Sequence, residues 1–441
     1  MGITTITAAR ILEGQMRGKS GEENLLSFET LPYVALSKTY SVNQQTPDSA
    51  PTMSAMMTGV KTNDGLISVN ENVARGNYRT VNGNQMMTIL ERAEERGMST
   101  GVVTTARLTH ATPAACYAHT AERDWESDAD QPAEANRAGF ADIARQLIEF
   151  RYGDGLEVAM GGGRAKFLPR TIADPEDPGS KGERNDGRDL IREWMDKYPD
   201  SAYVWDKAQF DAIDLARTRH LLGLFERSHM HFEYDRNKDR AGEPSLTEMT
   251  VKAIDILSRN PKGYFLMVEG GRIDHAHHAG NAFRALSETI ELSNAVRAAL
   301  QKIDLRNTLV IVTADHSHAF TLAGYPARGN NILGLVKEPG AADFARDRNG
   351  RPYTTLGYAN GPGYRGTKDR PELSQAIATD PDFLQEATVG LGWETHGGED
   401  VAIYAGGAQA HLIHGVMEQH VIYHVMSEAL GFDGELRQGD H

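Results

Sequence analysis

The stretch that most constrains the fold of this chain is an apolar run that passes through a glycine-rich turn into a long helix. Residues 263–268 (GYFLMV) have the composition of a buried β-strand, and apolar side chains recur at helical spacing over 282–300. A strand followed by a helix is the repeating unit of parallel sheets, in which ligands bind beyond the carboxyl ends of the strands. The sequence therefore predicts a functional site in the connecting segment, residues 269–280.

That segment reads Glu269-Gly-Gly-Arg-Ile-Asp-His-Ala-His-His278. Asp274 and His278 are four residues apart, so on a helical turn they share one face. A carboxylate with an imidazole suits zinc, and the additional carboxylate of Glu269 suits a harder cation such as magnesium. The alternative is an ordinary polar helix start with solvated histidines. This segment alone leaves both interpretations open.

The rest of the chain alternates predicted strands with predicted helices. Apolar or β-branched runs indicate strands, and amphipathic patterns indicate helices at 85–96, 114–123, 244–258 and 420–430, with strands at 100–105, 156–160, 307–313 and 401–404. This alternation predicts an α/β fold with a parallel sheet. Residues 337–395 lose the periodic pattern, so we interpret them as an insertion into a core formed by 1–336 and 396–441.

Composition narrows the class of partner. The formal net charge is −15, which argues against a nucleic-acid partner, because a phosphate backbone requires a basic surface. A small phosphate substrate remains compatible, since local metal ions can reverse the potential. No apolar run approaches the ~20 residues of a transmembrane segment. Cys116 is the single cysteine, which excludes an intrachain disulfide and leaves the compartment open. No signal peptide is visible in the chain as given.

Further polar clusters lie beside other predicted strands. His110 and Thr112 follow the strand at 100–105, Asp315 and His316 follow the strand at 307–313, and His396 precedes the strand at 401–404. Ser49 lies at a predicted helix amino terminus, where free N–H groups attract an anion, although a plain N-cap serine is the commoner explanation. Each cluster alone has a structural explanation, but together they indicate a metal and anion site.

At this point the chain resembles the alkaline phosphatase family over essentially its whole length. The supporting stretches are PDSAPTMSAMMTGVKT, HATPAACYAH followed by ER, VEGGRIDHAHH, VTADHSH and ETHGGEDV. RIDHAHH and HGGEDV, with His110 and His275, are closer to the animal-type branch. The resemblance implies a large, mostly parallel central sheet flanked by helices on both faces. It also implies hydrolysis of small phosphate monoesters, a crown-like insertion at 337–395, a homodimer and a periplasmic or secreted location.

Residue roles carry over from the family position by position. The resemblance implies that Ser49 becomes phosphoserine, that Asp48 orients Arg123, and that Arg123 holds two phosphate oxygens. It implies two zinc ions and one magnesium ion per subunit: Asp274, His278 and His396 for the first zinc, Asp315 and His316 for the second zinc, and Thr112 and Glu269 for magnesium. His110 and His275 occupy positions that contact the magnesium hydration shell and the phosphate. His277 and His318 match no ligand position, and we expect them to be structural.

A separate calcium site is implied for the animal-type branch. The matching positions are Glu176, Phe225, Glu226 and Glu243, although the alignment needs a gap around residues 235–243. Ordinary surface acids are the alternative interpretation, and both stay open.

The chain departs from the family pattern at its start. The family begins with a central strand ending in Gly-Asp-Gly-Met-Gly, whose aspartate bridges the second zinc and the magnesium. Met1-Gly2 matches only the end of that motif. We therefore expect the reading frame upstream of Met1 to encode an apolar strand ending in Gly-Asp-Gly, and we expect the chain as written to fold poorly or hydrolyse weakly.

Two alternative functions follow from these observations. One is a phosphodiesterase or sulfatase of the same superfamily, although Ser49-Ala-Pro-Thr-Met53 lacks the arginine of the sulfatase pattern C-x-P-x-R. The other is a truncated or inactive homologue that still binds metal. A Ser-His-Asp hydrolase is disfavoured, because Ser49 lacks a G-x-S-x-G context.

Overall fold

The computed structural model describes residues 1–366 and 370–432. Residues 367–369 of the expected insertion and residues 433–441 of the expected core lie outside the described residues. The domain division at 337–395 stays a prediction.

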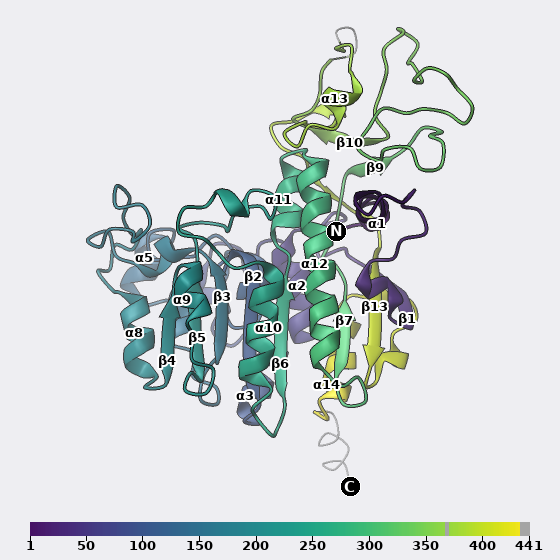
Figure 1. Ribbon diagram of the computed structural model, residues 1–441. Coiled ribbons are helices and arrows are strands. Elements are labelled where there is room, and N and C mark those ends of the chain that lie inside the picture. The colour runs from purple at the N-terminus through teal and green to yellow at the C-terminus, as the bar shows by residue number, and fades with distance from the viewer. Residues whose placement is uncertain (367–369, 433–441) are drawn as a thin grey trace.

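Among the described residues, nine strands form the body of the molecule in two sheets (Figure 1). The first sheet is entirely parallel and has the order β4 (Ser201–Val204), β5 (His220–Leu224), β3 (Val158–Gly162), β2 (Ser99–Arg107), β6 (Tyr264–Glu269). In the second sheet β1 is parallel to β14 and antiparallel to β13, and the order is β14 (Gly415–Glu418), β1 (Tyr33–Lys38), β13 (Val401–Gly407), β7 (Leu309–Val312). The predicted α/β fold with a mostly parallel sheet is confirmed.

The edge strand β6 of the first sheet lies opposite the edge strand β7 of the second sheet. In the part of the chain that the structure describes, no strand pairs with either of these edges. A cavity of about 940 Å³ lies between them and is lined by all of 264–269 and 309–312. Met1 lines the cavity, and its buried α-ammonium donates a hydrogen bond to the backbone carbonyl of His316 at 2.8 Å. That a strand precedes Met1 stays a prediction.

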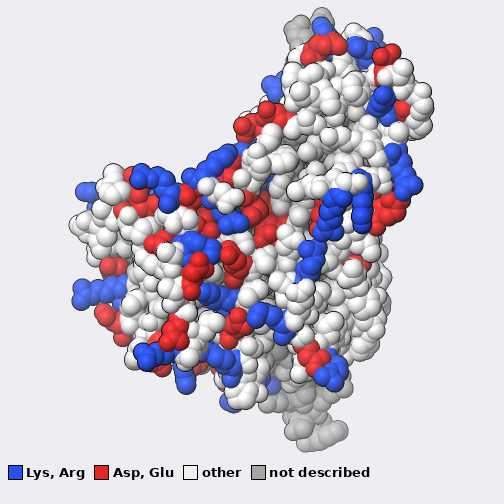
Figure 2. Space-filling view, viewed as in Figure 1, with Lys and Arg blue, Asp and Glu red and all other residues white. Residues whose placement is uncertain are grey.

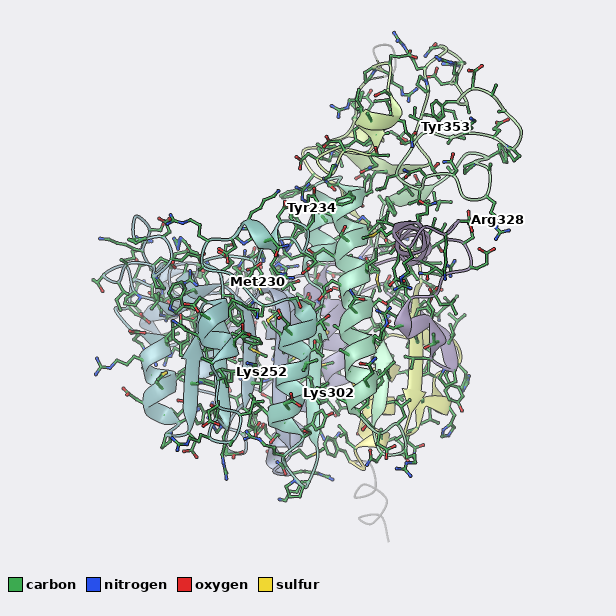
Figure 3. All side chains as sticks on the ribbon, viewed as in Figure 1. Met230, Tyr234, Lys252, Lys302, Arg328 and Tyr353 are labelled. Atoms are coloured by element: carbon green, nitrogen blue, oxygen red, sulfur yellow. The ribbon has the colours of Figure 1, made fainter. Side chains whose placement is uncertain are left out.

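Helices cover both faces of the sheets, and alternate side chains of the strands build the two layers of core. Val102 packs into a core with α2 (Ser49–Thr58), α3 (Ile89–Glu95) and α14 (Val421–Ala429), whereas its neighbour Val103 packs into a core with α1 (Ile3–Met16), α10 (Leu246–Leu257) and α12 (Ala282–Lys302). Lys302, labelled in Figure 3 at the end of α12, pairs with Asp255 of α10 at 2.6 Å. The remaining α-helices are short: α4 (Ala111–Ala114), α5 (Ala133–Arg137), α6 (Ile143–Ile148), α7 (Arg164–Phe167), α8 (Leu190–Lys197), α9 (Lys207–Asp211), α11 (Arg272–His278) and α13 (Gln375–Ala378).

The helix predicted at 114–123 is wrong. The helix α4 comprises Ala111–Ala114, and the chain then leaves the helical path, because Thr120 forms an antiparallel bridge with Ile67. The backbone N–H of Arg123 then donates to the carbonyl of Gly65 at 2.9 Å. Pairing with a distant segment therefore outweighs the local helical pattern.

A projection stands above the sheets in Figure 1 and carries β9 (Phe320–Leu322), β10 (Leu356–Gly361), β11 (Ala387–Gly390) and α13. Its three strands form a small sheet with β10 in the middle. Near Arg328, labelled in Figure 3, the projection meets the loop after α1, where the N–H of Gly329 donates to Glu22 at 2.7 Å. A two-stranded sheet of β8 (Ser317–His318) and β12 (His396–Gly397) lies at its base.

Among residues 1–366 and 370–432, we find no helix whose length and apolarity together would allow it to cross a bilayer. On the face shown in Figure 2, acidic and basic side chains are interspersed.

Candidate metal and phosphate site

The predicted site residues come from separate segments that end at the same edge of the sheets. Glu269 is the last residue of β6, and α11 follows it with Asp274, His275 and His278. The other segments are the start of α4 with its N-cap His110 and Thr112, the loop after β7 with Asp315 and His316, β12 with His396, and the first residue of α2, Ser49. Carboxyl ends of parallel strands meet at one edge, which explains this convergence.

Asp274 lies at the centre of the cluster. Its Oδ1 atom is 3.3 Å from Nε2 of His278, 3.4 Å from Nε2 of His396 and 3.9 Å from Nε2 of His316. Burial alone would raise the pKa of Asp274, but hydrogen bonds from His278, His318 and His396 outweigh it and hold that pKa well below its ordinary value. Asp274 is therefore a carboxylate surrounded by imidazoles.

The orientation of the histidine rings fits a bound cation. Nδ1 of His278 donates to the carbonyl of Glu394 at 2.6 Å, and Nδ1 of His396 donates to the carbonyl of Pro47 at 2.7 Å. Their Nε2 atoms then face each other at 3.1 Å, next to Asp274. This arrangement favours a cation at that point: the interaction with Asp274 outweighs burial and raises the pKa of His278 to about 9. A metal ion that displaces the proton satisfies all three groups.

His316 links this cluster to Ser49. Nε2 of His316 is 3.2 Å from Oδ2 of Asp315 and 2.9 Å from Oγ of Ser49, while Nδ1 faces the carbonyl of Ser317. Burial lowers the pKa of His316 to about 3, so the ring is neutral and Nε2 offers a lone pair. The sequence motif around Ser49 contained no base, and the fold supplies this imidazole from a segment 267 residues away.

Arg123 lies on the other side of Ser49. Its guanidinium forms an ion pair with Asp48, the N-cap residue of α2, and Nη2 lies 3.1 Å from Nε2 of His110. Oδ2 of Asp48 also accepts from the N–H of Gly65 at 3.2 Å. The guanidinium and the amino terminus of the ten-residue helix α2 therefore face the same space beside Ser49.

Glu269 and Thr112 lie together beneath these residues. Oε2 of Glu269 accepts a hydrogen bond from Thr104, which sequence reasoning did not single out, and Glu269 also interacts with Thr112. Burial, with the nearby charges of Asp315 and Asp274, raises the pKa of Glu269 to about 7. A buried carboxylate among hydroxyls is an oxygen-rich environment of the kind that magnesium prefers.

Two further residues belong to the cluster: His318, which we expected to be structural, and Glu394, which the sequence analysis did not single out. His318 lies 3.0 Å from Oδ1 of Asp274 through Nε2 and 2.8 Å from Glu394 through Nδ1. Both side chains are fully buried. The repeated pattern of histidine and acid in VTADHSH and ETHGGED was the available signal. His277, by contrast, is held by Thr5 and Tyr358 at 3.0 and 2.8 Å and stays a structural residue.

His229 is another residue that the sequence did not indicate. Its ring lies 4.0 Å from that of His275, and the ring of His110 lies 5.4 Å from that of His229. The backbone N–H of Arg107 donates to Nδ1 of His229 at 3.1 Å. His110 and His275, both predicted, therefore form a small group of imidazoles with His229 at the side of Arg123.

The acidic side chains predicted to bind calcium lie close together, but the ring of Phe225 is not part of that group. Glu226 and Glu243 both approach Nδ1 of His231, at 3.0 and 3.7 Å, and Asp239 joins the same cluster. Glu176 faces Asp239 and also pairs with Arg164 at 2.9 Å. Phe225 precedes Glu226, and its ring is buried against Phe210.

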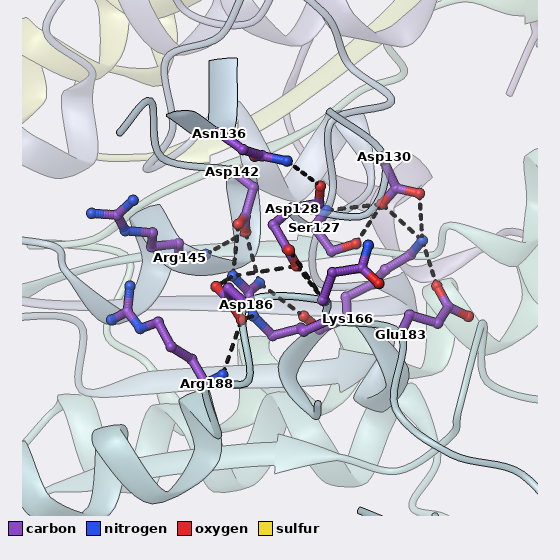
Figure 4. Close-up of polar contacts among 12 residues, drawn as sticks. Ser127, Asp128, Asp130, Asn136, Asp142, Arg145, Lys166, Glu183, Asp186 and Arg188 are labelled. Carbon is purple, nitrogen blue, oxygen red and sulfur yellow. Dashed lines mark hydrogen bonds and ion pairs between the residues drawn. The ribbon is translucent and has the colours of Figure 1, made fainter. Parts of the chain in front are cut away.

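A second acidic cluster is neutralised by the protein itself. Asp128, Asp142 and Asp186 approach one another in the network of Figure 4. Arg184 donates to both oxygens of Asp142, at 3.0 and 2.8 Å, and pairs with Asp186 at 2.5 Å. Its fully buried guanidinium occupies the place of a cation, so this cluster is structural.

Comparisons with known proteins agree with this geometry. The family model of alkaline phosphatase matches residues 1–432. This chain belongs to the alkaline phosphatase family. It is 46% identical over 436 residues to the tissue-nonspecific alkaline phosphatase of Gallus gallus, which covers 97% of this chain and 82% of the relative. The alkaline phosphatase of Gadus morhua is also 46% identical, over 97% of this chain and 89% of its own length.

Solved structures share the fold. The crystal structure of Thermus thermophilus alkaline phosphatase has a TM-score of 0.69 and 23% identity, covering 98% of this chain and 89% of that one. Members of the family hydrolyse phosphate monoesters and depend on metal ions, and this chain is a phosphomonoesterase of that family.

Proposed function

We propose that this alkaline phosphatase cleaves phosphate monoesters through a phosphoserine at Ser49. The observation that carries the proposal is the position of Ser49 Oγ, at the amino terminus of α2, between His316 on one side and the Asp48–Arg123 pair on the other. A phosphate beside Oγ would meet helix N–H groups and a planar guanidinium, which can bind two phosphate oxygens at once.

The donor sets support two zinc ions and one magnesium ion. We assign Asp274, His278 and His396 to the first zinc, Asp315 and His316 to the second zinc, and Thr112 and Glu269 to magnesium. When bound, these cations would supply the Lewis-acid charge that activates the serine hydroxyl and water and neutralises a leaving oxygen. The protein contributes orientation: the carbonyls of Glu394 and Pro47 hold Nδ1 of His278 and His396 and direct Nε2 inward.

Arg123, His110 and His275 would position the phosphate. Asp48 restricts the guanidinium of Arg123, so less rotational freedom is lost when phosphate binds. His110 contacts Arg123 at 3.1 Å, and the ring of His275 lies 5.5 Å from that of His110. Both imidazoles therefore border the space in front of Ser49 and are placed to donate to phosphate or to water.

Substitution of Ser49 tests the proposal. We expect Ser49→Ala to lose at least about 10³-fold in kcat for a phosphate monoester, because the covalent step is removed. Incubation of the unmodified protein with inorganic phosphate at low pH should add one phosphoryl group at Ser49, detected by mass spectrometry.

The matched control is Ser20→Ala, a serine in the loop after α1 whose hydroxyl donates to Glu23 at 3.1 Å. Unchanged turnover in Ser49→Ala would refute the assignment. Turnover of phosphate diesters or sulfate esters faster than monoesters would favour the related phosphodiesterase or sulfatase activities.

We also propose that Glu176, Glu226 and Glu243, with the carbonyl of Phe225, bind calcium. The support is the convergence of these acids and the burial of Glu243, which is 2% exposed and whose Oε2 atom is buried without a hydrogen-bond donor. Burial outweighs the interaction with His231 and raises the pKa of Glu243 to about 7, so a divalent ion would stabilise the ionised carboxylate further. Asp239 and His231 lie in the same cluster.

Calcium should therefore stabilise the protein. We expect millimolar calcium to raise the Tm by several degrees, and we expect Glu243→Gln to abolish that shift while the Tm without calcium changes little. The exposed Glu338→Gln is the matched control. An equal calcium response in Glu243→Gln would contradict the site.

A homodimer and an exported location complete the proposal, and both rest on the resemblance to the family. Sedimentation should give twice the mass of the 48.4 kDa chain, and a species of 48.4 kDa at micromolar concentration would contradict the dimer. Recovery of the full-length gene product from the cytoplasmic fraction alone would contradict export.

A further inference from the structure

The side chains that meet in the loops after β5 differ from the set expected for calcium. They are one imidazole and three carboxylates, whose ligand atoms all lie within 4.8 Å of one another: His231, Glu226, Asp239 and Glu243. Glu176, the remaining acid of the expected calcium set, is paired instead with the fully buried guanidinium of Arg164 at 2.9 Å. The site therefore offers a nitrogen ligand that the calcium prediction does not contain.

Two of the carboxylates are held by the backbone through one oxygen only. Oε1 of Glu243 accepts from the N–H of His231 at 2.9 Å, and Oδ1 of Asp239 accepts from the N–H of Ala241 at 3.2 Å. Oε2 of Glu243 and Oδ2 of Asp239 are buried without a donor among the described residues, and the side chain beside Asp239 is another carboxyl, that of Glu176. Buried oxygens without a partner are costly, so a cation at this point would stabilise both.

His231 supplies the nitrogen, and it follows Met230, which is labelled in Figure 3. Its Nδ1 atom lies 3.0 Å from Oε1 of Glu226 and 3.7 Å from Oε1 of Glu243. Ligands that surround a tetrahedral zinc ion at about 2.1 Å lie about 3.4 Å from one another. Because the two observed distances lie on either side of that value, a zinc ion can enter with only small movements of the side chains.

The imidazole distinguishes this cluster from the one around Arg184. A proton joins Nδ1 of His231 to Glu226 when no metal ion is bound, and an imidazole releases its proton to a metal ion. The guanidinium of Arg184 cannot be deprotonated, so it occupies its cluster permanently. Of these two clusters, only the one with His231 can therefore exchange its own cation for a metal ion.

We propose that this site binds zinc in preference to calcium, with His231 and three carboxylates as its protein ligands. Calcium takes about six to eight oxygen ligands, whereas zinc takes four and accepts imidazole readily. The inference rests on the metal site proposed above from Glu226 and Glu243 and changes the ion that this site selects. Calcium at millimolar concentration occupies the same site when zinc is absent.

The test measures which metals the holoenzyme retains. The unmodified chain, His231→Gln and His411→Gln are dialysed against micromolar zinc with millimolar magnesium and calcium, and their metal content is determined by mass spectrometry. We expect His231→Gln to hold one zinc ion fewer per chain and calcium in its place, because glutamine offers oxygen where zinc requires the imidazole nitrogen. His411→Gln replaces an exposed histidine outside the cluster and should match the unmodified chain.

Affinity and stability provide two further measurements on His231→Gln. Zinc affinity at this site, measured against graded chelator, should fall by about 100-fold or more, because loss of a neighbouring group alone commonly costs 10- to 100-fold. Calcium should still raise the Tm of this variant, because all three carboxylates remain.

The possible results separate this inference from the calcium proposal. If the unmodified chain retains calcium in place of the additional zinc, or if His231→Gln keeps that zinc, the preference for zinc through His231 is overturned and the metal site stands. A chain that holds neither the additional zinc nor calcium would refute the metal site as a whole. Because metal content and Tm are measured without substrate, these outcomes do not depend on turnover at Ser49.

Discussion

His318 shows how a single buried side chain can organise a metal cluster without matching a ligand position. One ring nitrogen lies 3.0 Å from Asp274 and the other 2.8 Å from Glu394, and Glu394 also accepts from the N–H of Ala319 at 2.5 Å. The series of contacts Glu394–His318–Asp274 restricts the orientation of the carboxylate that we assign to the first zinc. Such neighbouring groups commonly tune metal affinity.

Replacement of His318 should therefore weaken metal binding. We expect His318→Ala to lower zinc affinity by about 10- to 100-fold, because Asp274 loses its buried hydrogen-bond partner. Zinc content after dialysis against graded chelator measures the effect, and His318→Asn should recover part of it. The exposed His414→Ala is the control. If His318→Ala keeps its zinc but loses Tm, the residue has only a packing role.

For single residues, the sequence reveals which side chains can act as metal ligands. It does not reveal which residues lie beside them. Asp274 and His278 share a helical turn, so their spacing alone predicted that they lie on one face. His318 contacts the cluster because β8 and β12 pair in the register His396↔His318. That register joins two positions 78 residues apart in the chain, and no local pattern encodes it.

At the scale of elements, α12 was predicted from the helical spacing of its apolar residues. It also carries a buried glutamate, which that spacing does not explain. The prediction of 282–300 agrees with α12, Ala282–Lys302. Glu288 lies on its buried face, 3% exposed, and accepts from the N–H of Glu233 at 2.5 Å. Burial outweighs that hydrogen bond and the nearby Arg272, and it raises the pKa of Glu288 to about 8.

This shift predicts a pH dependence of stability. Between pH 4.5 and about 8 the folded protein keeps a proton on Glu288 that the unfolded chain has lost, so this group lowers the stability as the pH rises through that window. Glu288→Gln should flatten the fall of Tm between pH 5.5 and 9 and raise the Tm at pH 9 by about 2 °C or more.

The control for that prediction is Glu338→Gln, which removes an exposed carboxylate. It should change neither the Tm at pH 5.5 nor the Tm at pH 9. A pH profile of Glu288→Gln parallel to that of the original chain would contradict the assigned pKa.

The spacing of apolar residues predicted correctly the helices and strands that need only an apolar surface to pack against. It failed where a segment pairs with one particular distant segment. The prediction of 244–258 agrees with α10, Leu246–Leu257, and 401–404 lies within β13. The helix predicted at 114–123 failed because Thr120 pairs with Ile67. An amphipathic helix needs only an apolar surface, whereas a bridge requires one particular neighbour.

For the whole molecule, the candidate metal centre connects segments that are otherwise far apart in the chain. The ligand atoms of Asp274, His316 and His396 all lie within 4.8 Å of one another. Asp274 comes from α11, His316 from the loop after β7, and His396 from β12. Ions bound there would cross-link the first sheet, the second sheet and the base of the projection.

Metal removal should therefore affect activity and stability together. We expect a chelator to abolish phosphate-ester hydrolysis and to lower the Tm by several degrees, because the ligands of both sheets lose their common ion. Zinc and magnesium added in excess should restore both properties. Full activity in chelator, with no metal detected by mass spectrometry, would contradict the candidate centre.

The sequence by itself determined the class of fold, the family and the residue types of the site. Strand and helix periodicity are local, and the motifs around Ser49, Asp274, Asp315 and His396 are short and specific. Only the tertiary structure decided which groups meet: the hydrogen bond between Ser49 and His316, the contact of His318 with Asp274, and the cavity between β6 and β7. These depend on the pairing of distant segments, and the free energy of that pairing comes from surfaces that exist only in the folded chain.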